Sequence, residues 1–406
     1  MGRGGDGALS ATFTPRVEVI HGKCETAMAA MEPDSIDAIV TDPPYGIGFM
    51  GREWDRDFID RRVASKARKK TGVPAGHGRI ENGGFVEYDR TLTGNRAFQV
   101  WCEGWAHEAL RVLKPGGHMT VFGGTRTYHR MISGVEDAGF EIRDCLMFMY
   151  GVGFPKSHNL HGDWEGWGTA LKPAWEPIIL ARKPLSERNV AANVQRWGVG
   201  ALNIDGCRLG GSWERSTPTK GDIRGGRYGA SAGATIDCPP QASPDGGRWP
   251  ANVALDEEAA AMLDDATGDR PSGSAHVLRR GATTGAGMGY GSSAAGDVLN
   301  ATYGDSGGAS RFFYTAKADK ADRGRGNDHP TVKPVDLMRW LCRLVTPAGG
   351  TILDPFTGSG STLVAAAMEG FDAIGIDSDA HYCDIARRRA YAAAQPRLAL
   401  TGGDPR

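Results

Sequence analysis

The N-terminal part of the chain alternates apolar runs of strand length with segments whose apolar residues follow helical spacing. Gly and Pro separate these segments, and Lys114-Pro115-Gly116-Gly117 is expected to end one helix. The expected strands cover 17–20, 37–40, 118–122, 140–150 and 176–182, and the expected helices cover 25–31, 99–112 and 127–138. This repeated strand–helix–strand order predicts a mainly parallel sheet with helices on both faces.

The same alternation returns near the C-terminal end. Residues 351–356 and 373–377 are expected strands, and 363–369 is an expected helix between them. From about 185 to 325 the chain is instead rich in Gly and Ser, with a helix-like island at 256–265.

These changes of character predict an α/β domain in two parts, interrupted by a large irregular insertion. The predicted boundaries are 15–185 and 326–395 for the two parts, 186–325 for the insertion, and 1–14 and 396–406 for flexible tails.

Charge limits how the protein could bind nucleic acid. The 406 residues carry a formal net charge of -1, so such binding must come from local basic patches. One patch lies in the irregular stretch 51–96 and consists of Arg61, Arg62, Lys66, Arg68, Lys69 and Lys70. A mobile loop that contacts phosphates and a merely solvated face both explain this run.

Cysteine usage and hydropathy exclude several classes of protein. The seven cysteines include no C-x-x-C pair, which favours a reducing cytoplasm and argues against a disulfide framework or a zinc site. We therefore expect no metal. No apolar run reaches about 18 residues and no signal-like segment opens the chain, so we expect no membrane association.

The first candidate site is Asp42-Pro43-Pro44-Tyr45, directly after an expected strand. The prolines force extended backbone at the strand tip, where open α/β proteins bind their ligands. A carboxylate oxygen and a proline carbonyl can together accept both hydrogens of a planar amino group, while Tyr45 stacks on the ring that carries it. These four residues alone are equally compatible with a proline-rich turn.

The second candidate site begins at Asp354-Pro355-Phe356 and continues through a Gly-rich turn into a helix. Gly358 and Gly360 let the backbone approach a ligand, and the helix N-terminus offers unpaired N–H groups. Asp377 ends the next strand about 20 residues later, which suits two ribose hydroxyls. The turn lacks the lysine of an ATP phosphate loop, and a tight packing turn is the alternative interpretation.

These motifs resemble those of the DNA amino-methyltransferases. Asp42-Pro43-Pro44-Tyr45 resembles their catalytic motif, and Asp354-Pro355-Phe356-Thr357-Gly358-Ser359-Gly360 resembles their S-adenosylmethionine-binding motif. His329-Pro330-Thr331-Val332-Lys333-Pro334 is similar to their segment that packs beside the methionine moiety. The order, with the catalytic motif first, resembles the β group, which is circularly permuted relative to most methyltransferases. One departure is Lys23, where the family often has Asp near the cofactor adenine.

The resemblance implies a circularly permuted, Rossmann-like S-adenosylmethionine-dependent methyltransferase fold in which 186–325 is the target-recognition region. It implies double-stranded DNA as the partner and a flipped-out target base, in a bacterial or phage-encoded cytoplasmic protein. A homodimer and a cognate restriction endonuclease are both compatible with it. The implied catalytic residues are Asp42, Pro43, Pro44 and Tyr45; the implied cofactor-binding residues are Asp354, Pro355, Phe356, Gly358, Ser359, Gly360, Asp377, Lys333 and Pro334.

Other activities remain open at this point. Adenine N6 is the favoured target because Ser in place of Asp42 would favour cytosine, although Asp-Pro-Pro-Tyr does not exclude cytosine N4. RNA and protein glutamine methyltransferases usually carry Asn at this position and place the cofactor motif first. An inactive DNA-binding module agrees less well with motifs that are intact apart from Lys23. A cytosine C5 enzyme typically needs a Cys after Pro, and no Cys here follows Pro.

Overall fold

The computed structural model describes residues 15–46, 92–153, 157–210, 247–271, 306–317, 320–324 and 326–395. The predicted DNA contacts Arg61, Arg62, Lys66, Arg68, Lys69 and Lys70 lie outside these residues. The chain divides into two compact units. The first comprises Met1–Cys207, Asn252–Ala259 and Thr315–Arg406, and the second comprises Arg208–Ala251 and Ala260–Tyr314. The predicted insertion 186–325 therefore overlaps both units.

Within the described residues, nine strands form one sheet in the order β1-β11-β10-β2-β3-β5-β4-β6-β9. Their bounds are β1 (Val17–His21), β2 (Ile36–Thr41), β3 (Leu113–Phe122), β4 (Glu141–Met149), β5 (Trp175–Arg182), β6 (Val253–Asp256), β9 (Tyr314–Ala316), β10 (Thr351–Asp354) and β11 (Asp372–Asp377). The two-residue strands β7 (Arg270–Pro271) and β8 (Ser306–Gly307) pair separately.

The sheet joins strands from both ends of the chain. All pairings from β1 through β11, β10 and β2 to β3 are parallel. In this order, the two C-terminal strands β10 and β11 lie between the N-terminal strands β1 and β2. β5 pairs antiparallel with both β3 and β4. This is the predicted α/β, Rossmann-like architecture with a mainly parallel sheet.

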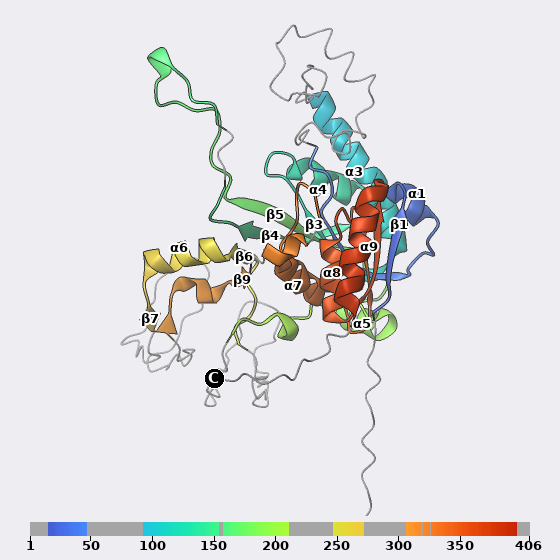
Figure 1. Ribbon diagram of the computed structural model, residues 1–406. Helices are drawn as coiled ribbons and strands as arrows, with labels where there is room; N and C mark the ends of the chain where they lie inside the picture. Colours follow the sequence, from blue (N-terminus) through green and yellow to red (C-terminus); the bar gives the residue numbers. More distant parts are fainter. Residues whose placement is uncertain are drawn as a thin grey trace, which may run out of the picture. The chain divides into compact units, whose positions relative to one another are not determined.

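Helices cover both faces of the sheet (Figure 1). α7, α8 and α9 pack side by side in one layer, and α1, α3 and α4 form the other. The helix bounds are α1 (Cys24–Ala29), α3 (Leu92–Val112), α4 (Tyr128–Asp137), α5 (Val190–Trp197), α6 (Glu257–Thr267), α7 (Val335–Val345), α8 (Ser361–Glu369) and α9 (Ala380–Ala394). Trp105 of α3 and Trp340 of α7 are fully or almost fully buried, so each layer has a large aromatic side chain in its core.

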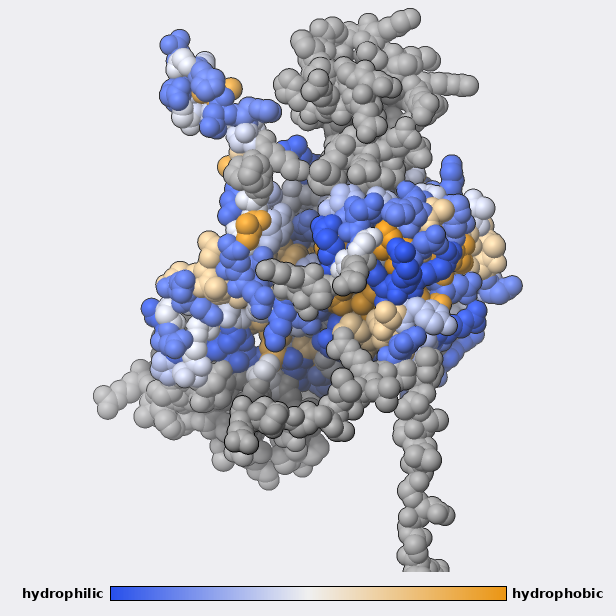
Figure 2. All heavy atoms as spheres, viewed as in Figure 1, coloured by the Kyte–Doolittle hydropathy of each residue, from blue (hydrophilic) through white to orange (hydrophobic). Residues whose placement is uncertain are grey.

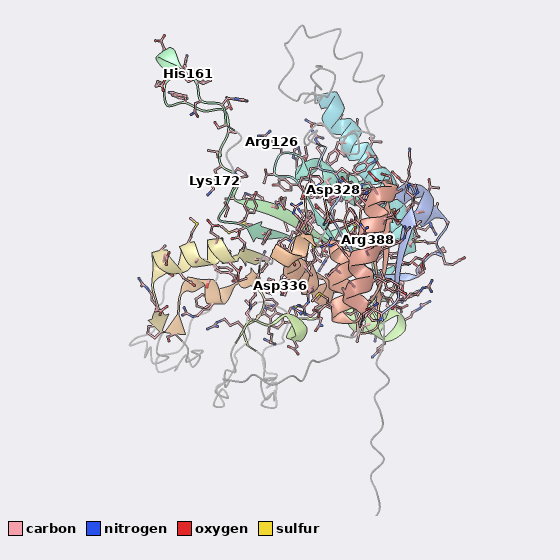
Figure 3. The ribbon with its side chains drawn as sticks, viewed as in Figure 1. Arg126, His161, Lys172, Asp328, Asp336 and Arg388 are labelled. Atoms are coloured by element: carbon pink, nitrogen blue, oxygen red, sulfur yellow. The ribbon has the colours of Figure 1, made fainter. Side chains whose placement is uncertain are left out.

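The outer helix α9 shows why these sequences form amphipathic layers. Tyr382, Ile385 and Ala386 are buried, whereas Arg387 and Arg388, which directly follow them, are exposed. Hydrophilic side chains accordingly cover much of the visible face over this layer in Figure 2, and Figure 3 labels Arg388 on α9.

β3 differs from its predicted extent. The strand begins at Leu113 and includes the Lys-Pro-Gly-Gly segment, which was expected to lie between a helix and a strand. Ile36 pairs with Leu113 but Ala38 pairs with His118, so the extra residues form an irregularity in the ladder with β2. The helix still ends at Val112, as predicted.

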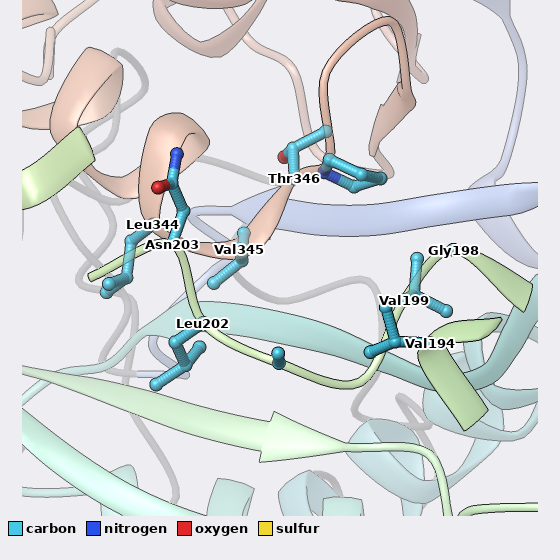
Figure 4. Close-up of a pocket in the computed structure, with 10 residues that line it drawn as sticks. Val194, Gly198, Val199, Leu202, Asn203, Leu344, Val345 and Thr346 are labelled. Carbon is cyan, nitrogen blue, oxygen red and sulfur yellow. The ribbon is translucent and has the colours of Figure 1, made fainter. Parts of the chain in front are cut away.

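A small cavity of about 160 Å³ lies between the end of α5 and the end of α7 (Figure 4). Val194, Val199, Leu202 and Leu344 give it an apolar lining. It adjoins the segment that leads into the first residue of β10, and the candidate site residues follow the last residues of β2 and β10. The cavity therefore lies toward the opposite edge of the sheet from the candidate sites.

Candidate active site

The two candidate motifs meet at one edge of the sheet. β2, β10 and β11 run parallel, with Leu353 beside Ile39 and Asp354 beside Gly375. Their carboxyl ends therefore lie together, and Asp42, Asp354 and Asp377 each end or directly follow a strand at that edge.

Asp377 ties the Gly-rich turn to the end of β11. Its Oδ2 accepts a hydrogen bond from the Gly358 N–H at 2.8 Å, and its Oδ1 accepts one from the Asp379 N–H at 2.8 Å. Burial raises the pKa of this carboxyl, although the two N–H donors oppose the rise. Each carboxylate oxygen has a second lone-pair direction, which is the geometry that ribose hydroxyls require.

Asp354 joins the tips of β10 and β2. The residue is 3% exposed, and its Oδ1 accepts from Thr41 Oγ1 at 2.6 Å and from the Phe356 N–H at 3.1 Å. Burial raises the pKa of Asp354 to about 6. The bond to Thr41 fixes the backbone immediately before Asp42.

The turn between β10 and α8 forms a close-packed cradle. Gly360 has φ of 83°, and a Cβ there would lie 2.9 Å from Cα of Ala386 in α9. Thr357 Oγ1 and Ser361 Oγ are buried without a hydrogen-bond partner among the described atoms. These hydroxyls, with the free N–H groups at the start of α8, fit a ligand that carries a carboxylate and hydroxyls.

Two other predicted cofactor residues are engaged within the protein. The Phe356 ring lies 5.6 Å from Trp101 and 5.4 Å from Trp105, measured between ring centroids. Ser359 is buried, and its Oγ accepts a hydrogen bond from Arg389 at 2.9 Å. Both therefore hold the turn in place, and their contact with a cofactor remains a prediction.

The tip of β2 has a different character. The Asp42 side chain is 23% exposed, and Oδ1 is buried with no hydrogen-bond partner among the described atoms. Its Oδ2 lies 3.3 Å from Lys333 Nζ. The Tyr45 backbone carbonyl accepts from Thr127 Oγ1 at 2.6 Å, which anchors the segment to the residue that precedes α4.

Lys333 lies with the catalytic group. Its Nζ donates to the Tyr45 hydroxyl at 2.8 Å and to Glu176 Oε2 at 2.8 Å, and it lies 4.6 Å from the centroid of the Phe122 ring. Its side chain is only 13% exposed. The sequence grouped Lys333 with the cofactor residues, and the structure places it directly between Asp42 and Glu176.

The charges in this cluster influence one another. Burial raises the pKa of Asp42, while Lys333 lowers it and Glu176 raises it further, with a net rise. Burial alone would lower the pKa of Lys333, but Asp42 and Glu176 raise it well above its usual range. Burial and Asp42 raise the pKa of the Tyr45 phenol well above normal, so Tyr45 stays protonated.

Glu176 is a site residue that the sequence analysis missed. It lies in a strand that was predicted, but it belongs to no recognisable motif. β5 runs antiparallel to β3, so its first residues lie at the edge where the parallel strands end. Only this topology brings Glu176 to Lys333, which is 157 residues away in sequence.

Two exposed cations flank the same edge. Arg126 follows the carboxyl end of β3, and Lys172 precedes the first residue of β5; both are labelled in Figure 3. Lys172 Nζ also donates to the carbonyl of Gly151 at 2.7 Å. Cations at these positions can reach phosphates of a nucleic acid that approaches the strand tips.

In the parts of the chain that the structure describes, no group of three or more His, Cys, Asp or Glu side chains has the geometry of a metal site. None of the described helices is long and apolar enough to cross a membrane.

Comparison with known proteins identifies the class. The family model described as DNA methylase, whose name denotes N6 and N4 methyltransferases, matches residues 36–388, and the chain belongs to this family.

Among individual relatives, the Type II methyltransferase M.HindIII of Haemophilus influenzae is 31% identical over 191 residues, which is 43% of this chain and 60% of M.HindIII. The Type II methyltransferase M2.DpnII of Streptococcus pneumoniae is 48% identical over 61 residues, which is 15% of this chain and 23% of M2.DpnII. The chain thus matches less than two thirds of the length of either relative.

Solved structures of similar proteins include a complex of M1.HpyAVI with S-adenosylmethionine, with a TM-score of 0.39 and 14% identity. That match covers 92% of this chain and 99% of the other. The cytosine-N4-specific PvuII DNA methyltransferase has a TM-score of 0.43 and 12% identity, over 93% of this chain and 86% of the other.

Proposed function

We propose that this protein transfers a methyl group from S-adenosylmethionine to the exocyclic amino nitrogen of a base in double-stranded DNA. The observation that carries this proposal is the buried, unpartnered Oδ1 of Asp42, at the sheet edge that also holds the Gly-rich turn. A buried hydrogen-bond acceptor in that position is suited to a donor from a ligand. Membership of the DNA methylase family supports the reaction class.

The proposed role of the β2 tip is to hold and activate the amino group. Asp42 Oδ1 accepts one amino hydrogen and the Pro43 carbonyl accepts the other. These bonds favour a pyramidal nitrogen whose lone pair faces the methyl donor, which is a positioning and electrostatic effect. The amino nitrogen loses its extra proton after the transfer, so a strong general base is not required.

The turn after β10 is the proposed cofactor site. When bound, S-adenosylmethionine supplies an electrophilic methyl group on its sulfonium. Asp377 would accept the ribose hydroxyls, and the N-terminal N–H groups of α8 with Ser361 would bind the carboxylate. Gly358 and Gly360 allow this close approach of the backbone.

Duplex DNA is the proposed substrate, and the target base must leave the helix to reach Asp42. Tyr45 is the proposed stacking platform, and its Lys333-bound hydroxyl fixes the ring in one orientation. The exposed Arg126 and Lys172 are suited to phosphate contacts, together with the predicted basic segment 61–70. The Type II relatives suggest a restriction–modification context for the enzyme.

Adenine N6 is the proposed target in preference to cytosine N4. The basis is Asp at position 42, since Ser at that position favours cytosine. Both bases present an amino group beside a ring nitrogen, so the proposed contacts of Asp42 and Pro43 apply to either.

Nucleoside mass spectrometry tests this proposal. Unmethylated DNA of varied sequence is incubated with the protein and S-adenosylmethionine, digested to nucleosides and analysed. We expect 6-methyladenine. Appearance of 4-methylcytosine instead would retain the mechanism and overturn the choice of base, whereas no methylated nucleoside would contradict the DNA methyltransferase assignment.

A further inference from the structure

Lys333 and Glu176 connect the catalytic carboxylate to the rest of the fold. We propose that both are positioning residues for methyl transfer: Lys333 fixes the orientation of Asp42, and Glu176 fixes Lys333. This inference rests on the proposed function and concerns how the same site is assembled.

The contacts of Lys333 show how it restricts the orientation of the Asp42 carboxylate. Lys333 Nζ reaches Glu176 Oε2 and the Tyr45 hydroxyl at 2.8 Å each, and Asp42 Oδ2 at 3.3 Å. These three contacts use the full donor capacity of an ammonium group. Because Oδ2 is held by Lys333, the carboxylate cannot rotate freely, and Oδ1 is left as the oxygen available to a base.

The backbone that carries the Lys333 side chain is itself held in place by packing. Lys333 directly precedes Pro334, which is the N-cap of α7, and α7 packs its buried face against α8 and strands β2 and β3. Glu176 is held in the ladder between β4 and β5, opposite Phe148. The carboxylate of Asp42 is thus positioned from two elements other than its own strand.

Four titratable side chains from different segments influence Asp42 or are influenced by it. Lys333 precedes α7, Glu176 belongs to β5, Tyr45 follows β2, and Asp354 ends β10. Lys333 favours the ionised form of Asp42, and Glu176 opposes it. Only the ionised form keeps both oxygens as acceptors, so the methylation rate should fall when acid protonates Asp42.

The two roles predict opposite pH effects. Removing the positive charge by Lys333→Gln should move the acidic limb of the kcat–pH profile to higher pH. Removing the like charge by Glu176→Gln should move that limb to lower pH, because Asp42 then ionises more easily. Both variants should also lose activity, by about 100-fold for Lys333→Gln, since a misplaced catalytic group costs that much.

The experiment measures kcat against pH for the full-length protein on methylatable DNA, together with calorimetric affinity for S-adenosylmethionine and the melting temperature. Affinity for the cofactor should change by less than about threefold in both variants, because the contacts that the structure describes for Lys333 and Glu176 are with the β2 tip, with Phe122 and with each other. A large loss of affinity in Lys333→Gln would overturn the positioning role in favour of a cofactor-binding one. Glu176→Gln keeps Lys333 paired with Asp42, so it provides the test if Lys333→Gln does not fold.

Glu141→Gln is a matched control. Glu141 of β4 pairs with Arg182 at the opposite end of β5, at 2.6 Å, so its change removes an ion pair from the same two strands but away from Asp42. Its acidic limb should coincide with that of the unaltered protein. If Lys333→Gln and Glu176→Gln also leave the limb in place, or shift it in the same direction, the inference is wrong. If the unaltered protein methylates no DNA, the proposed function itself fails, and the two failures are distinguished.

Discussion

The tips of β10 and β2 lie at one edge of the sheet but satisfy their carboxylates in different ways. At β10 and the neighbouring β11, both carboxylates accept from donors within the protein: Asp354 accepts from Thr41, and Asp377 accepts from the Gly358 N–H. At β2, one buried oxygen of Asp42 has no partner among the described atoms, and the other lies beside the Lys333 ammonium, which also pairs with Glu176.

This contrast separates two ways of building a binding site. The carboxylates on the β10 side bind donors within the protein and so shape the turn before a ligand arrives, although the hydroxyls of Thr357 and Ser361 in that turn stay unpartnered among the described atoms. At the β2 tip it is the carboxylate itself that keeps a buried acceptor with no partner among the described protein groups, and such groups reduce stability. We therefore expect substitutions at the β2 tip to remove activity without unfolding the protein, and substitutions at the β10 turn to affect folding and cofactor binding together.

The largest effect is expected for Asp42→Ala. Loss of the acceptor should lower the methyl-transfer rate by about 10²–10³-fold, the usual cost of removing one transition-state hydrogen bond. The melting temperature should stay the same or rise, because Lys333 keeps Glu176 as its partner. Tritium transfer from labelled cofactor and thermal melting measure the two quantities.

Asp37→Ala provides the reciprocal control on the same strand. Asp37 lies near the other end of β2, pairs with Lys114 at 2.6 Å and accepts from the Thr351 N–H. Its removal should lower the free energy of unfolding by about 3 kcal/mol and leave the rate per folded molecule unchanged. Near-normal turnover by Asp42→Ala would show that the carboxylate has no catalytic role.

The next effect concerns the fold of the cofactor turn. Gly360→Ala places a methyl group 2.9 Å from the Ala386 Cα at φ of 83°, so we expect a loss of about 3 kcal/mol in unfolding free energy and weaker cofactor binding. Gly370→Ala is matched to it, because Gly370 ends α8 with φ of 79° but has nothing within 4 Å of an added Cβ. That control should lose only about 1 kcal/mol and bind the cofactor normally. Denaturant unfolding and calorimetry compare them, and equal losses in both would mean that the contact with α9 is unimportant.

The strands and motifs of both tips could be predicted because each depends on a short, continuous stretch of sequence. An apolar run bounded by Asp-Pro marks the ends of β2 and β10, and the Gly-rich turn precedes a helix. The helix α7 was not predicted, although Val335, Met338, Leu341 and Val345 follow helical spacing directly after a proline and are buried.

The charged cluster around Asp42 could not be predicted in the same way. Lys333 is recognisable only as part of a motif, and Glu176 is an ordinary strand residue. Their contact depends on β5 running antiparallel, which places its first residues beside the tips of the parallel strands. Local propensity does not determine that reversal, so the partner of Lys333 becomes visible only in the folded sheet.

The smallest effect, and the one that most directly separates folding from binding at the β10 side, is expected for Asp377→Ala. The change removes the acceptor for the Gly358 N–H and the proposed acceptor for ribose, so affinity for S-adenosylmethionine should fall by about tenfold or more. Asp379→Ala is the matched control, because Asp379 accepts from the His381 N–H as the N-cap of α9. It should cost about 1 kcal/mol of stability and leave affinity within about twofold. Calorimetric titration of both variants decides: if Asp377→Ala binds the cofactor as tightly as Asp379→Ala does, Asp377 only supports the turn, and the ribose must be held by other groups.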